Sequence, residues 1–231
     1  MKLGIMQPYF FPYIGYFQLI HAVDKFVVYD DVSYIKQGWI NRNRILISGQ
    51  PHYFTVPIAT ASSSKSIREV QVCRGDWRSK LLKSVDHAYK RSPFFSEVFP
   101  LIEEVLLSDE ASISRLAFAS ILTVATYLGI KTEFVETSAI YGNEQLKAQE
   151  RVIDICRIES ASHYINPIGG LELYSKQSFS SCGIDLKFVR SKFVEYAQFR
   201  NDFVPWLSII DVLMFNGKDK THDFLAEYEL L

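Results

Sequence analysis

Residues 3–31 read LGIMQPYFFPYIGYFQLIHAVDKFVVYDD and carry the clearest pattern of secondary structure in the chain. The apolar run 3–6 predicts a strand, residues 15–23 predict a helix, and the β-branched and aromatic run 25–29 predicts a second strand. A connection this short between two buried strands favours a parallel pair. The opening of the chain therefore predicts an α/β protein.

The rest of the chain alternates between the two kinds of pattern. Strands are predicted at residues 52–58, 67–72, 132–135, 163–165 and 184–189. Helices are predicted at residues 76–89, 92–107, 112–128, 145–157 and 204–215. We expect one domain, 1–231, with a Rossmann-like, mostly parallel sheet, flanking helices and a helical subdomain at about 76–130.

Composition narrows the class of protein. Hydrophobic residues make up 48% of the 231 residues and charged residues 22%, as in folded globular proteins. Because 25 Lys and Arg stand against 26 Asp and Glu, no excess of positive charge favours nucleic acid as a partner. The longest uncharged run, 116–130, is too short and too polar for membrane insertion. Three widely spaced cysteines without a metal-ligand pattern indicate a cytoplasmic protein.

The connection between the first strand and the first helix is the first candidate site. It carries Gln7, Tyr9, Tyr13 and Tyr16, and ligands of parallel sheets gather at the carboxyl ends of the strands. A phosphate or carboxylate could bind at the helix N-terminus near Gly15. The alternative is a connection made rigid by proline, whose aromatic rings only pack.

Asp30 and Asp31 follow the second strand and are the candidate catalytic residues. Neighbouring residues of an extended strand point to opposite faces, so we do not expect the two carboxylates to act as one pair. One of them could serve as a base, a Mg²⁺ ligand or a ribose acceptor. The alternative is that they cap the following turn.

A polar and aromatic stretch follows and is the second candidate binding segment. Two arginines that share a face, with an aromatic neighbour, suit a diphosphate or carboxylate plus a stacked ring. The alternative is a solvated edge strand. The candidate substrate-binding residues are Lys36, Trp39, Asn41, Arg42, Asn43 and Arg44.

The turn after residues 163–165 is the third candidate binding segment. Asn166 is followed by Gly169 and Gly170, which allow close approach of the backbone to a ligand. An ordinary strand-to-helix turn would have the same composition. No metal site is predicted, and no Walker loop, GxGxxG or GxSxG motif occurs.

Three blocks read together resemble the signature of the WbqC-like protein family. They are IMQPYFFPYIGYF at 5–17, DKFVVYDDV at 24–32 and GWINRNRI at 38–45, and the likeness continues at 149–151, 164–170 and 207–216. The family is named from O-antigen gene clusters. The resemblance implies bacterial surface-polysaccharide (lipopolysaccharide) synthesis, with work on a nucleotide-linked sugar.

The leading hypothesis from this resemblance is a transferase that moves an acyl or aminoacyl group to the amine of a nucleotide-linked amino sugar. Asp30 or Asp31 would take the amine proton, Arg42 and Arg44 would hold a diphosphate, and Trp39 or Tyr9 would stack on a ring. The donor would be acyl-CoA or an acyl-carrier protein.

Two alternatives stay open. The opening is similar to that of nucleotidyltransferases and adenylate-forming ligases of the HIGH-motif type, which would use a Mg-nucleotide, but the HxGH motif is missing at residues 12–17. The other alternative is a non-catalytic protein that binds a sugar nucleotide or a glycosyltransferase. The sequence leaves donor, sugar and oligomeric state open.

Overall fold

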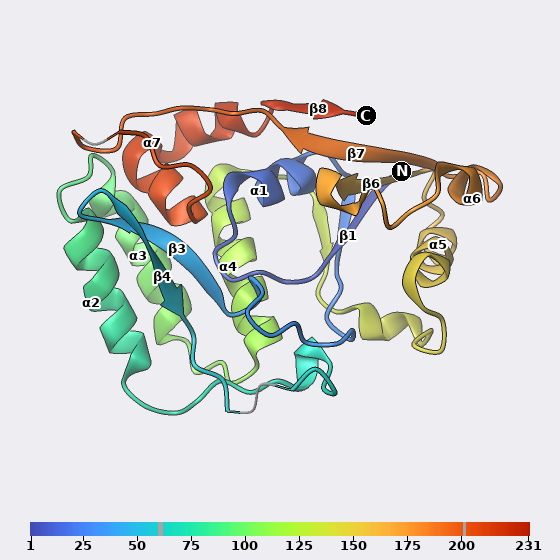
Figure 1. The fold of residues 1–231 in the computed structure, drawn as a ribbon, viewed down its shortest axis with the longest axis horizontal. Helices are drawn as coiled ribbons and strands as arrows, with labels where there is room; N and C mark the ends of the chain where they lie inside the picture. Colours follow the sequence, from blue (N-terminus) through green and yellow to red (C-terminus); the bar gives the residue numbers. More distant parts are fainter. Residues whose placement is uncertain (60–61, 201) are drawn as a thin grey trace.

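The computed structural model describes residues 1–59, 62–200 and 202–231 and is built around one six-stranded sheet (Figure 1). The strand order is β5-β2-β1-β6-β7-β8, in which only β8 runs antiparallel to its neighbour. The predicted α/β class with a mostly parallel sheet is confirmed. The sheet strands are β1 (Lys2–Met6), β2 (Lys25–Val28), β5 (Glu133–Val135), β6 (His163–Pro167), β7 (Asp185–Ser191) and β8 (Tyr228–Leu230).

Helices cover both faces of this sheet. The α-helices are α1 (Ile14–His21), α2 (Trp77–Tyr89), α3 (Phe95–Leu107), α4 (Ile113–Leu128), α5 (Ala148–Ile158), α6 (Lys176–Ser180) and α7 (Ile209–Phe224). The 3₁₀ turns in the described residues are η1 (Ile67–Glu69), η2 (Ser138–Tyr141) and η3 (Ile168–Gly170). None of the helices in the described part of the chain has both the length and the apolarity of a membrane span.

Two hydrophobic cores form because the central strands are buried on both faces. Phe26 and Val28 of β2 belong to the core that contains residues of α1, α2, α3, α4 and α7. Val27, between them, belongs to the core that contains residues of α5 and α6. The helices predicted at 76–130 lie in the first core, which continues without a break from α2 and α3 to the sheet.

The parallel pairing of β1 with β2 is also confirmed. Met6 lies opposite Val28, so both strands end at the same edge of the sheet. Gln7 and Tyr29 are the first residues beyond these ends, and β5 pairs with β2 in the same direction. This edge therefore gathers chain segments from three strands.

A two-stranded hairpin lies outside the main sheet. Its strands are β3 (Arg42–Ile47) and β4 (Gln50–Thr55), joined by Ser48 and Gly49. Both turn residues have positive φ, 52° and 77°, as a two-residue type I′ turn requires. In Figure 1 the hairpin lies beside α2 and α3, far from α5 and α6.

The structure differs from the predicted elements at several places, and β3 and α6 are among the elements that no prediction covered. The strand predicted at 67–72 is wrong: η1 begins there, because Ser66 and Glu69 form a capping box that favours a helical turn. The last helix begins at Ile209, after the cap of Ser208, and not at residue 204. The edge strand β8 was not predicted, since its three residues carry too short a pattern.

Candidate functional site

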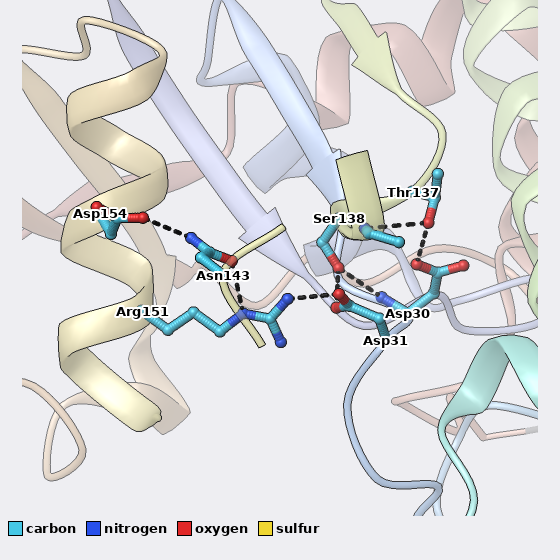
Figure 2. A network of polar contacts seen from close by, with 8 residues as sticks. Asp30, Asp31, Thr137, Ser138, Asn143, Arg151 and Asp154 are labelled. Atoms are coloured by element: carbon cyan, nitrogen blue, oxygen red, sulfur yellow. Dashed lines mark hydrogen bonds and ion pairs between the residues drawn. The ribbon is translucent and has the colours of Figure 1, made fainter. Parts of the chain in front are cut away.

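A buried polar network follows the carboxyl end of β2 (Figure 2). The Asp30 carboxylate accepts hydrogen bonds from Ser114 Oγ at 2.9 Å and from Thr137 Oγ1 at 2.7 Å. The Asp31 carboxylate accepts one from Ser138 Oγ. Thr137 and Ser138 follow β5, so the parallel sheet brings the ends of two strands together here.

Arg151 completes this network from α5. Its guanidinium forms an ion pair with Asp31, and both side chains are only 4% exposed. Nε of Arg151 donates to Asn143 Oδ1 at 3.0 Å, and Asn143 donates to Asp154 at 2.7 Å. Burial lowers the pKa of Arg151, but the hydrogen bond to Asp31, the charge of Asp31 and the contact with Tyr29 together outweigh this, so the pKa lies above its ordinary value.

The two aspartates thus have different side-chain partners, and both lie beyond the end of β2, so the expectation of opposite strand faces does not apply to them. Hydroxyl groups donate to both carboxylates, and among the described residues only Asp31 of the two forms an ion pair. In the described ranges no three His, Cys, Asp or Glu side chains are grouped as a metal site would require. The catalytic role of Asp30 and Asp31 stays a prediction.

A cavity of about 410 Å³ lies between the β1–α1 connection and the hairpin. We call it the aromatic pocket, because four of its seven lining residues are Trp or Tyr. They are Tyr9, Pro12, Tyr13, Trp39, Asn43, Arg44 and Trp206.

Hydrogen bonds to the backbone of Phe10 and Phe11 hold the walls of the aromatic pocket together. Asn43 Nδ2 donates to the carbonyl of Phe11 at 2.8 Å, and Ser208 Oγ donates to the same carbonyl at 2.7 Å. The amide of Phe10 donates to the carbonyl of Trp39 at 3.2 Å. Two distant segments, residues 39–43 and Ser208, therefore meet at the loop of Phe10 and Phe11, which preforms the cavity.

Arg44 is the charged group of the aromatic pocket. Its Nη2 donates to the carbonyl of Trp206 at 2.8 Å, and its guanidinium carbon lies 5.8 Å from the centre of the Trp39 ring. Its Nε is buried and has no hydrogen-bond partner in the described part of the chain. A buried donor without a partner is costly, so an acceptor from a ligand would stabilise this arrangement.

Some of the predicted binding residues line the aromatic pocket, and others lie outside it. Tyr9, Trp39, Asn43 and Arg44 line the aromatic pocket. Asn41, also predicted, is buried and bonds Tyr34 and the carbonyl of Val56, so its contacts are internal.

Arg42 and Lys36 lie outside the aromatic pocket. Arg42 shares the solvent-side face of β3 with Arg44, as predicted, but donates to the carbonyls of Gln37 and Gly38. Its guanidinium carbon also lies 4.7 Å from the centre of the Tyr53 ring. Lys36 is exposed.

Gln7 lies in the connection between β1 and α1, and Tyr16 lies in the first turn of α1. Tyr16 is buried and donates to the carbonyl of Gln7 at 2.8 Å. Burial raises the pKa of Tyr16 well above its ordinary value, so its hydroxyl stays a hydrogen-bond donor. It supports the loop on which Tyr9 is carried, with the two rings 5.6 Å apart.

The third predicted segment lies at the end of β6. Asn166 is buried and accepts a hydrogen bond from Tyr164 at 3.1 Å. A Cβ on Gly170 would overlap the amide of Asn166, whereas a Cβ on Gly169 would meet nothing within 4 Å. Gly170 is therefore required for close packing, and Gly169 is exposed on the surface.

Sequence reasoning missed Trp206 and Arg151. It also missed the hydroxyl groups that donate to the two aspartates, which belong to Ser114, Thr137 and Ser138. Trp206 was assigned to a helix, although Pro205 before it favours a loop. Arg151 lies 120 residues from Asp31 along the chain, and no local pattern connects the two.

Comparisons with known proteins agree with the resemblance seen in the sequence. An uncharacterized protein of Mycobacterium tuberculosis, Rv1507c, is 29% identical over 227 residues, which cover 97% of each chain. No solved structure matches. The model of the WbqC-like protein family matches residues 7–223, a range that contains both the buried polar network and the aromatic pocket. The chain belongs to the WbqC-like protein family.

Proposed function

We propose that the protein is a transferase of bacterial surface-polysaccharide synthesis that binds a nucleotide-linked amino sugar in the aromatic pocket. The observation that carries this proposal is the combination of Trp39, Trp206 and the partly unpaired Arg44 around one preformed cavity. Membership in the WbqC-like family supports the biological setting, because the family is named from O-antigen gene clusters.

The shape of the aromatic pocket suits one ring and one anionic group. Its volume of about 410 Å³ lies within the usual range of ligand sites, roughly 300–1,000 Å³. Trp39 and Trp206 are 37% and 56% exposed, so part of each side chain is accessible to a sugar or a base. Arg44 is half-buried and would bind a diphosphate oxygen through the accessible part of its guanidinium.

The proposed reaction forms an amide on the sugar. The amine nitrogen attacks the carbonyl of an acyl or aminoacyl thioester, a C–N bond forms, the C–S bond breaks, and the thiol leaves with a proton. Asp30 or Asp31, which lie outside the lining of the aromatic pocket, would act on a part of the ligand that extends beyond it: after one hydroxyl donor such as Thr137 turns away, the carboxylate would take the proton that the amine loses and pass it to the leaving thiolate. The donor would be acyl-CoA or an acyl-carrier protein.

A second candidate function is non-catalytic binding of a sugar nucleotide. It is favoured by the hydroxyl donors and the ion pair that occupy Asp30 and Asp31. Such a protein would bind the same ligands in the aromatic pocket and convert none of them.

The test is calorimetric titration with UDP- and dTDP-amino sugars, followed by an assay for thiol release from acyl-CoA. We expect Arg44→Ala and Trp206→Ala to weaken binding at least tenfold, because each removes a wall of the pocket. Arg42→Ala is the matched control, since Arg42 lies on the same strand face outside the cavity.

Unchanged binding in the Arg44→Ala and Trp206→Ala variants would contradict the proposed site. Binding without thiol release from any donor would favour the non-catalytic function. Binding of ATP or CTP only with Mg²⁺ would instead favour phosphate chemistry.

A further inference from the structure

A second cavity, of about 910 Å³, lies at the opposite end of β3 from the aromatic pocket. Three segments form its walls: the end of β3, the carboxyl end of α2, and residues 199–200. Its lining includes four basic residues, His87, Lys90, Arg91 and Arg200, and no Asp or Glu among the described residues. We call it the basic pocket.

The charge of the basic pocket is not balanced by the protein. Basic side chains elsewhere, such as Lys25 and Arg151, form ion pairs with carboxylates. Lys90, Arg91 and Arg200 form no ion pair with any described residue and are exposed. Three permanent positive charges around one cavity favour an anionic ligand.

The walls of the basic pocket are fixed by one buried carboxylate, that of Asp211. Tyr89, the last residue of α2, donates to it at 2.8 Å, and Gln198, just before the loop 199–200, donates to it at 2.7 Å. The Tyr89 hydroxyl also accepts from the amide of Leu46 on β3 at 2.9 Å. All three walls therefore meet at the same hydrogen-bonded cluster, and the cavity is preformed.

Phe199 is held in an unfavourable conformation at the rim of the basic pocket. Its φ is 54°, and no type I′ hairpin accounts for it, in contrast to Ser48 on the opposite wall. A positive φ costs a non-glycine residue about 1–2 kcal/mol, and residues of this kind cluster at binding sites. The ring is 39% exposed and lies 6.0 Å from the guanidinium carbon of Arg91.

We propose that the basic pocket binds a nucleotide that carries two or more phosphate groups. Arg91 and Arg200 bind the phosphate oxygens in a bidentate manner, Lys90 adds a third charge, and the base lies against the Phe199 ring. Leu46 and Ala88 provide an apolar floor.

This site is separate from the aromatic pocket and does not depend on the function proposed for it. Arg44 and Leu46 are two residues apart on β3, about 7 Å along the strand, and their side chains line different cavities. The protein would therefore hold two ligands side by side.

The experiment is calorimetric titration of the full chain with pyrophosphate, ADP, AMP and adenosine at low ionic strength. We expect ADP to bind more tightly than AMP and pyrophosphate, and adenosine not to bind. Arg91→Ala and Arg200→Ala should each weaken ADP binding about tenfold or more. Arg74→Ala, which removes an exposed arginine outside both pockets, is the matched control.

Further variants distinguish the parts of the proposal. Phe199→Ala should reduce ADP affinity to that of pyrophosphate, and equal affinity of the two ligands for the parent protein would overturn the nucleotide assignment. ADP binding that survives in the double variant Arg91→Ala, Arg200→Ala, or no binding of ADP and pyrophosphate at millimolar concentration, would overturn the site. Loss of ADP binding in Arg44→Ala alone would place the ligand in the aromatic pocket.

Discussion

The Tyr89 hydroxyl donates a hydrogen bond of 2.8 Å to the carboxylate of Asp211, 122 residues further along the chain. Tyr196 and Gln198 donate to the other oxygen of the same carboxylate at 2.7 Å each. Asp211 is fully buried, and all three of these donors are uncharged. Burial therefore raises the pKa of Asp211 to about 6, against the lowering effect of its hydrogen bonds.

The first prediction concerns the pH dependence of stability. Because the pKa of Asp211 is raised in the folded state, its protonated form stabilises the fold below the unfolded pKa, and this contribution is lost as the pH rises through about 6. The rise from 3.8 to about 6 corresponds to roughly 3 kcal/mol. Urea unfolding from pH 4 to pH 7 should show the parent losing about this much relative to Asp211→Asn. Asp223→Asn, an exposed position on the same helix, should show no such trend.

The second prediction concerns the Tyr89 hydroxyl, which joins Leu46 on β3 to Asp211 on α7. Tyr89→Phe leaves a buried amide and a buried carboxylate each short of a partner. We expect a loss of about 1–3 kcal/mol in the free energy of unfolding, measured in urea at pH 7. Tyr53→Phe, at a position that is 57% exposed, should change it by less than about 0.5 kcal/mol. An equal effect of the two variants would show that the cluster does not stabilise the fold.

The third prediction compares two neighbouring glycines. Gly170→Ala should displace Asn166 and destabilise the protein by about 1–3 kcal/mol, because the new methyl group overlaps the Asn166 amide. Gly169→Ala has open space and should stay within about 0.5 kcal/mol of the parent. Thermal unfolding of the two variants is the measurement, and comparable melting temperatures would contradict the close packing at Gly170.

The fourth prediction concerns the buried ion pair of Arg151 and Asp31. Arg151→Met leaves a buried carboxylate without its cation and should cost about 3–5 kcal/mol. The double variant Arg151→Met, Asp31→Asn should cost less than the sum of the two single changes, as a double-mutant cycle in urea would measure. The exposed pair of Arg190 and Glu229, 3.8 Å apart, is the control and should couple by less than about 1 kcal/mol. Additive effects at Arg151 and Asp31 would mean that the pair is not coupled.

Much of the fold could be predicted because the elements that form it carry local patterns. The apolar residues of β1 and β2 and the short connection between them predict a parallel pair, which the register of Met6 with Val28 confirms. The pattern failed at residues 67–72, where alternating polarity indicated a strand. There the capping box of Ser66 and Glu69 satisfies backbone groups locally and favours η1.

Local sequence patterns identify the residues that are available for binding: aromatic rings beside the first helix and two arginines on one face of β3. The contacts that these residues make depend on the packing of distant elements. The tertiary structure turned Arg44 toward Trp206 and placed Arg42 against its own loop. It also gave Asp31 a cation from α5. The periodicity of a sequence indicates the face on which a side chain lies, because that face depends on neighbours in the chain. The partner of a side chain depends on how distant elements pack, and no local pattern encodes that packing.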